Sequence, residues 1–122
     1  MEAVENGFRE GTMKILILCD DKWHPAEVVE RGLAFLAEEG HDFVRDAKDI
    51  LTPAFLGRYP VVINAKGNAL TGANDAPWFE EGVTEAGPEE LREYVEAGGG
   101  FLSLHAGNSF KAEENKAYTD FV

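Results

Sequence analysis

The sequence predicts an α/β domain built on a mainly parallel sheet. Short, continuous apolar runs alternate along the chain with segments in which apolar residues recur at helical spacing. The runs are uninterrupted rather than alternating with polar residues, which is typical of strands that helices bury on both faces. Strands that alternate with helices need crossover connections, and these connections make successive strands parallel.

The first part of the chain predicts two strands with a helix between them. Residues 14–20 form the first apolar run, and residues 41–46 are a weaker second candidate. The helix is expected to begin at Pro25, which suits a first helical position, and to stop at Gly40. Its apolar stripe consists of Val29, Leu33 and Leu36, with Val28 and Phe35 beside them.

The remainder of the chain continues the alternation. A short helix is expected to begin near Thr52, with Thr52 as the cap and Pro53 in the first position. The long polar segment 65–87 is expected to be a functional or mobile loop. The other expected elements are a strand at 60–64, a helix that begins at Pro88 and ends at glycines 98–100, and a fourth strand at 101–105.

Length, charge and cysteine content restrict the class of protein. The chain has 122 residues, which suits one domain, and we assign residues 13–122 to it after a disordered leader at residues 1–12. A formal net charge of −12 favours solubility and disfavours nucleic acid and anionic membrane surfaces as partners. A single cysteine, no apolar run near the roughly 20 residues of a membrane span and no signal sequence predict a cytoplasmic protein.

Polar side chains follow three of the expected strands at their carboxyl ends. In open α/β sheets, ligands bind outside these ends, so we expect a site there that is centred on His105. The candidate residues are Asp20, Asp21, Trp23 and His24 after the first strand, Asn64, Lys66 and Asn68 after the third, and His105 and Asn108 after the fourth.

Most of these residues also have a plainer interpretation. Asp20 and Asp21 can cap the turn before the helix, and His24 can be a helix N-cap residue, which we favour over a metal ligand. Lys66 can be solvated, and the asparagines can stabilise turns. Cys19, in a buried strand, is expected to be inert rather than nucleophilic.

His105 is the sharpest candidate. It follows an apolar strand and precedes Ala106 and Gly107, and a sharp turn from strand to helix needs such small neighbours. A polar side chain at this turn is expected to lie at the carboxyl ends of the strands and to face the site. The alternative is a buried histidine that is hydrogen-bonded within the core.

Four segments of the chain resemble the ThuA-like, or trehalose-utilisation, family, which belongs to the class I glutamine amidotransferase-like superfamily. They are residues 14–20, residues 23–25 (Trp-His-Pro), residues 64–68 (Asn-Ala-Lys-Gly-Asn) and, most specifically, residues 98–107 (Gly-Gly-Gly-Phe-Leu-Ser-Leu-His-Ala-Gly). The resemblance implies a flavodoxin-like, three-layer fold. It also implies that the chain matches the N-terminal part of a longer ThuA-like domain, so a missing sheet edge favours a homo-oligomer.

The resemblance also implies a role in carbohydrate utilisation, with a sugar as the small-molecule substrate. His105 stands where relatives in the superfamily carry the cysteine nucleophile, so we expect no glutaminase activity. His105 and His24 can act as acid and base, with Asp20 or Asp21 orienting one of them. No metal ligands are assigned, the cofactor is left open, and whether the protein is an enzyme is also open.

Two alternatives stand beside this reading. The first is a non-catalytic binding or structural domain of amidotransferase-like build. The second is a phospho-accepting receiver domain, suggested by the acid pair Asp20 and Asp21. It is disfavoured because Asn64 stands where the phospho-accepting aspartate would be, and Lys66 follows too early to be the distant lysine.

Overall fold

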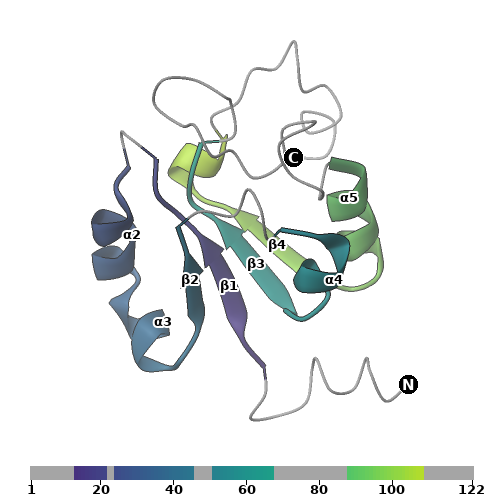
Figure 1. Cartoon of the computed structure of the whole chain (residues 1–122), viewed down its shortest axis with the longest axis horizontal. Coiled ribbons are helices and arrows are strands. Elements are labelled where there is room, and N and C mark those ends of the chain that lie inside the picture. The colour runs from purple at the N-terminus through teal and green to yellow at the C-terminus, as the bar shows by residue number, and fades with distance from the viewer. Residues whose placement is uncertain (1–12, 22–23, 46–50, 68–87, 109–122) are drawn as a thin grey trace.

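The structure, a computed structural model, describes residues 13–21, 24–45, 51–67 and 88–108. In this part of the chain, four parallel strands form one sheet in the order β2-β1-β3-β4 (Figure 1). This order is that of the flavodoxin-like folds, so the predicted α/β class with a parallel sheet is confirmed. The strands are β1 (Ile15–Leu18), β2 (Asp42–Val44), β3 (Val61–Asn64) and β4 (Gly100–Ser103).

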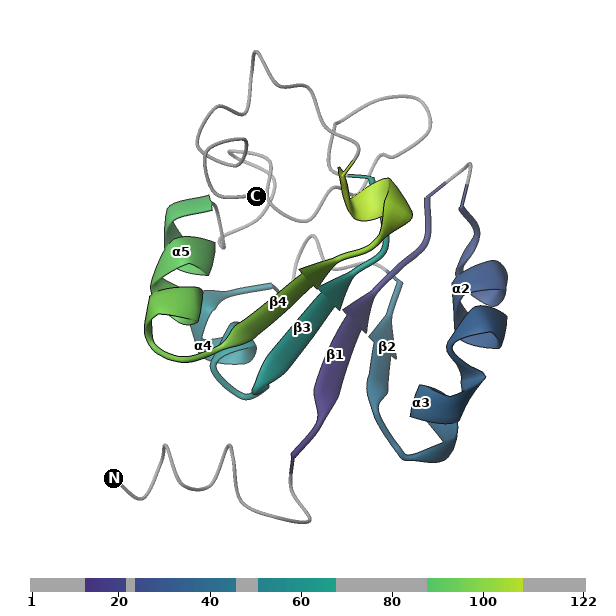
Figure 2. The same cartoon turned by 180° about the vertical axis from the view of Figure 1, so that it is seen from behind.

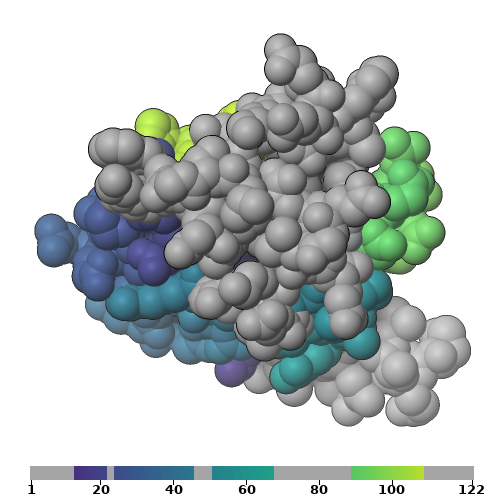
Figure 3. All heavy atoms as spheres, turned by 45° about the horizontal axis from the view of Figure 1, so that its top comes forward, coloured from purple at the N-terminus to yellow at the C-terminus, as the bar shows by residue number. Residues whose placement is uncertain are grey.

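Helices cover both faces of the sheet, which gives three layers. Helices α2 (Ala26–Gly32) and α3 (Ala34–Glu38) lie on one face, and α4 (Pro53–Leu56) and α5 (Pro88–Glu96) lie on the other (Figures 1 and 2). Seen as spheres, the two helical layers border opposite sides of the molecule (Figure 3). A short 3₁₀ helix, η1 (His105–Asn108), follows β4.

Alternation along the strands divides the core in two. On the face of α4 and α5, Leu16, Leu18 and Val62 pack with residues from those helices and their flanks into one buried cluster. On the face of α2 and α3, Ile17 and Ile63 pack with Leu36 in a smaller cluster. The sheet is therefore apolar on both faces, as the uninterrupted apolar runs predict.

Two predicted element boundaries follow from local chemistry. The Thr52 hydroxyl accepts a hydrogen bond from the Phe55 backbone N–H at 3.1 Å and so caps α4, with Pro53 in the first position, as expected. At the end of α5, Gly98 has a φ of 110°, a conformation that favours glycine. A side chain at Gly99 would collide with the Tyr94 ring, so the turn into β4 needs two adjacent glycines.

The predicted helix between Pro25 and Gly40 is two helices. Helix α2 ends at Gly32, and Leu33, with φ −112° and ψ 30°, separates it from α3. Glycine has poor helix propensity, which explains why the break falls here. The predicted stripe is confirmed at Leu36, but the flanking Val28 and Phe35 are 59% and 57% exposed.

The strands are shorter than the apolar runs suggest. The fourth strand was predicted to reach His105 but ends at Ser103, because the chain turns into η1 at His105. No helix within the described residues is both long and apolar enough to cross a membrane. The expected leader at residues 1–12, together with Trp23 and Asn68, lies outside the described residues.

Candidate functional site

The site lies where the chain changes direction across the sheet. From β1 the chain crosses through α2 and α3 to β2 at one edge, and from β3 it crosses through α5 to β4 at the other edge. Strands β1 and β3 are neighbours, so their carboxyl ends flank the switch point at which ligands bind in open α/β sheets.

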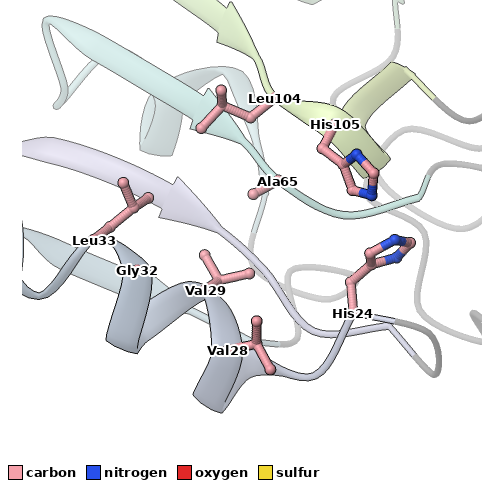
Figure 4. A pocket seen from close by; sticks show the side chains of 8 residues that line it. All are labelled: His24, Val28, Val29, Gly32, Leu33, Ala65, Leu104 and His105. Atoms are coloured by element: carbon pink, nitrogen blue, oxygen red, sulfur yellow. The ribbon is translucent and has the colours of Figure 1, made fainter.

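Two histidines from distant parts of the sequence meet at this place. His24 precedes α2, and His105 begins η1 after β4. Their ring centroids are 4.8 Å apart and the ring planes are inclined at 76° (Figure 4). The structure thus brings together the two residues that the sequence predicts as acid and base.

Asp21 holds the His24 ring in place. Its Oδ1 lies 2.9 Å from His24 Nδ1 and also accepts the His24 backbone N–H at 2.9 Å. Its Oδ2 accepts the Gly67 backbone N–H at 2.8 Å, which joins the segments after β1 and β3. An ionised carboxylate can only accept, so the proton of a neutral His24 ring lies on Nδ1 and the lone pair on Nε2.

The pKa of Asp21 fits this role. Its side chain is only 4% exposed, and burial acts to raise the pKa. The hydrogen bonds from Gly67 and His24 outweigh burial and lower the pKa of Asp21 below its ordinary value. Asp21 is therefore a carboxylate at neutral pH.

Asp20 serves the fold, as its plainer interpretation proposes. Its Oδ1 accepts the Ala26 backbone N–H at 2.9 Å at the start of α2. The N-cap residue of that helix is Pro25, which has no side chain able to accept a hydrogen bond. The interpretation of His24 as the N-cap residue is therefore wrong, because Asp20 supplies the capping oxygen from further back in the chain.

His105 occupies a tight turn that points its side chain outwards. It is exposed and has a φ of 45°, in the left-handed region. A Cβ at Gly107 would overlap the Asn64 carbonyl oxygen and lie 2.8 Å from Ser103 Oγ, so the turn requires glycine there. The alternative of a buried, hydrogen-bonded His105 is wrong, because the close approach of Gly107 to β3 leaves the ring outside the core.

Backbone strain gathers at the same rim. Among the described residues other than glycine, only Asp20 and His105 have a positive φ, and both follow the carboxyl end of a strand. Such conformations cost on the order of 1 kcal/mol or more for a residue with a side chain, and they cluster at functional sites.

Three other candidate residues lie at the strand ends and make hydrogen bonds to other parts of the fold. Asn64 and Lys66 are fully buried, and Asn64 Oδ1 accepts the Lys66 backbone N–H at 3.3 Å. Lys66 Nζ donates to the Arg45 carbonyl at 3.4 Å, so the interpretation of Lys66 as a solvated side chain is wrong. Asn108 is exposed, and its Oδ1 accepts a hydrogen bond from Ser103 Oγ at 3.0 Å.

A pocket of about 260 Å³ adjoins the histidine pair on the α2 side of the sheet (Figure 4). Sequence reasoning missed it, because its apolar side chains have the spacing of ordinary core residues. One signal was present, since Gly32 interrupts an otherwise regular helical pattern. The pocket is lined by His24, Val28, Val29, Gly32, Leu33, Ala65, Leu104 and His105.

Cys19 has the properties of an inert thiol. It is fully buried, and burial raises its pKa to about 11, with Glu30 and Asp20 adding to the effect. Its Sγ lies 3.7 Å from the Val44 carbonyl. Within the described ranges, no group of three or more His, Cys, Asp or Glu side chains could hold a metal ion.

Comparison with known proteins gives no relative: no family model, no curated protein and no solved structure matches this chain. What the site can do is therefore set by its own residues. A carboxylate, an imidazole that it orients and a second imidazole within ring contact lie at the switch point of a parallel sheet.

Proposed function

We propose that the protein binds a small molecule of the carbohydrate class around His105 and transfers protons to and from it through His24 and His105. The observation that carries the proposal is the contact between these two rings at the switch point of the sheet. The carbohydrate class comes from the resemblance to the ThuA-like family.

The arrangement of Asp21 and His24 suits a general base. Asp21 fixes the tautomer and orientation of the His24 ring, so Nε2 is the atom that takes a proton from a substrate hydroxyl. The resulting imidazolium is stabilised by the Asp21 carboxylate. Imidazole is the side chain best suited to this exchange near neutral pH.

His105 suits the complementary role of acid. It reaches the site from β4, whereas His24 reaches it from β1, so a substrate beside the ring pair can contact both imidazoles. The strained turn and the close approach of Gly107 to β3 limit the movement of the backbone that carries His105.

We further propose that the protein has no glutaminase activity. That reaction needs a thiolate that attacks the amide carbon, and the turn after β4 carries histidine instead. Cys19 cannot replace the missing thiolate, because it is buried at the end of another strand and its pKa is raised to about 11.

The test compares His105→Ala and His24→Gln with the control His41→Gln. His41 lies at the opposite end of the sheet, where Nδ1 accepts the Ile15 backbone N–H at 2.9 Å, and glutamine can retain an acceptor there. Binding and turnover of trehalose and glucose are measured by NMR. We expect both site variants to lose them and the control to retain them, with circular dichroism unchanged.

Sugar turnover that survives in His105→Ala would contradict the proposed role of that residue. A non-catalytic binding domain is the second candidate, because Asp20, Asn64 and Lys66 make hydrogen bonds within the fold itself. It predicts that the wild-type protein binds the sugar at every pH between 5 and 9 without any turnover.

A further inference from the structure

We propose that the pocket beside His24 and His105 receives an apolar group of the substrate, such as an aromatic ring or a short branched alkyl chain. A glycoside with an apolar aglycone is then preferred as substrate over a free sugar. The sugar part of this inference rests on the proposed function, and the apolar part rests on the pocket.

The composition of the pocket carries the inference. One wall comes from α2, with Val28 and Val29, and from Leu33 directly after it, and the other comes from the strand ends, with Ala65 and Leu104. The two imidazoles lie together at one end, and Leu33 and Leu104 lie towards the other (Figure 4).

The two imidazoles supply the polar side chains among the residues that line the pocket. A sugar hydroxyl deeper in the pocket would therefore lose its hydrogen bonds to water and gain none from these walls. A hydrocarbon group in the same place gains from leaving water. The lining thus favours an apolar group beside the atoms on which the histidines act.

The size of the pocket agrees with one small group. An apolar cavity of about 150 Å³ is enough to bind benzene. The volume of about 260 Å³ therefore holds a phenyl ring with room for the atoms that join it to a sugar. The wall on α2 extends over about one and a half turns, which is short for the repeated anchors of a docked helix.

Gly32 is one of the residues that line this pocket. A Cβ added at Gly32 meets nothing within 4 Å, and its φ is not in the left-handed region. Alanine would be favoured over glycine at a helical position on propensity alone. A longer side chain at Gly32 therefore fits without displacing the backbone, at a position that lines the pocket.

The experiment measures the dissociation constants of three probes by NMR titration: phenyl α-D-glucopyranoside, methyl α-D-glucopyranoside and benzyl alcohol. The proteins are the wild type, Gly32→Leu and the control Ala37→Leu. Ala37 is an exposed residue of α3 that does not line the pocket. Gly32→Ala, which adds one methyl group into open space, is a second variant should the leucine variant fail to fold.

We expect the wild type and Ala37→Leu to bind the phenyl glucoside at least tenfold more tightly than the methyl glucoside. Gly32→Leu should abolish this preference and the binding of benzyl alcohol, and Gly32→Ala should reduce both. Equal affinity for the two glucosides would overturn the apolar subsite and leave the proposed function standing.

The remaining outcomes separate the two proposals. Binding of benzyl alcohol without either glucoside would support the apolar pocket and overturn the carbohydrate class. If no probe binds, both the carbohydrate class and the apolar subsite are overturned. This outcome is also expected if another segment of the protein fills the pocket. A phenyl preference that persists in Gly32→Leu would overturn the placement of the group in this pocket.

Discussion

The two faces of the sheet differ in how completely they are packed. Among the residues that the structure describes, seven buried side chains on the face of α4 and α5 form a cluster that joins the sheet to both helices, and Tyr94 packs against it. In the same part of the chain, the cluster on the face of α2 and α3 has three buried side chains. Leu102 lies on this side, because its neighbour Phe101 packs against the cluster on the other face, and it is 48% exposed.

Hydrogen bonds reinforce the difference. We call the face of α4 and α5 the closed face and the face of α2 and α3 the open face. On the closed face, Tyr94 donates to the Tyr59 carbonyl at 2.7 Å, and Tyr59 donates to the Asp42 carboxylate at 2.8 Å. Burial raises the pKa of each phenol to about 12, so both remain donors at neutral pH. The open face has instead the pocket, beside the histidine pair. The larger buried cluster and the proposed binding site therefore lie on opposite sides of one sheet.

The largest expected effect contrasts one leucine from each face. Leu91→Ala should lower the free energy of unfolding by about 2–5 kcal/mol, because Leu91 is fully buried in the larger cluster. Leu102→Ala should change it by no more than about 0.5 kcal/mol, because Leu102 is half exposed. Urea denaturation of both variants measures the contrast. Similar losses would mean that the open face is covered in solution.

The next contrast uses two glycines on the side of the pocket. Gly107→Ala should cost about 1–3 kcal/mol, because the new methyl group overlaps the Asn64 carbonyl and the backbone must move. Gly32→Ala should stabilise by about 0.5–1 kcal/mol, because its methyl group meets open space in a helix. Thermal unfolding measures both, and a neutral Gly107→Ala would show that the turn adapts without the close approach.

A smaller effect concerns the carboxylate that orients His24. Asp21→Asn should cost about 1–2 kcal/mol at pH 7, because it removes a charge that accepts several hydrogen bonds. The pKa of Asp21 is lowered in the folded state, so its contribution is present above the ordinary value of 3.8 and is lost as pH falls through the folded value.

Urea titrations between pH 7 and pH 3 test this expectation. The wild type should lose stability towards low pH, and Asp21→Asn should lose less over the same range. Parallel curves would contradict the lowered pKa. Asp42→Asn is a useful control, because that carboxylate accepts a hydrogen bond from Tyr59 and belongs to the first residue of β2, whereas His24 and His105 follow the carboxyl ends of strands.

Replacing His105 with glycine is expected to stabilise the fold slightly. His105→Gly should raise the free energy of unfolding by up to about 1 kcal/mol, because glycine adopts a φ of 45° without strain. The same variant should lose sugar binding. Chemical denaturation and NMR titration of one sample measure both properties, and a loss of stability would show that the turn depends on the imidazole.

The fold was largely predictable because its signals are local. The apolar runs at β1 and β3 and the cap at Thr52 follow from short stretches of sequence. The break at Leu33 was not predicted, because the apolar periodicity continues through it while the backbone does not. The early end of β4 depends on the contact of Gly107 with Asn64 in a neighbouring strand, which sequence spacing does not show.

The location of the site was predictable from the sequence, but the roles of the individual carboxylates and the pocket were not. Carboxyl ends of parallel strands meet at one edge, so the meeting of His24 and His105 follows from the topology. The sequence does not show that Asp20 caps α2 while Asp21 orients His24, because either carboxylate could cap the helix. The pocket was missed because the uncovered surface of a helix is set by tertiary packing and not by its own residues.

The place of β4 at one end of the strand order has a consequence for how the protein behaves at high concentration. Its outer edge has no strand partner among the described residues, and an edge of this kind next to an exposed apolar side chain such as Leu102 is a place where two copies can pair. The net charge of −12 opposes such pairing through mutual repulsion. Because salt screens that repulsion, light scattering should show little association at low ionic strength and more as salt is added.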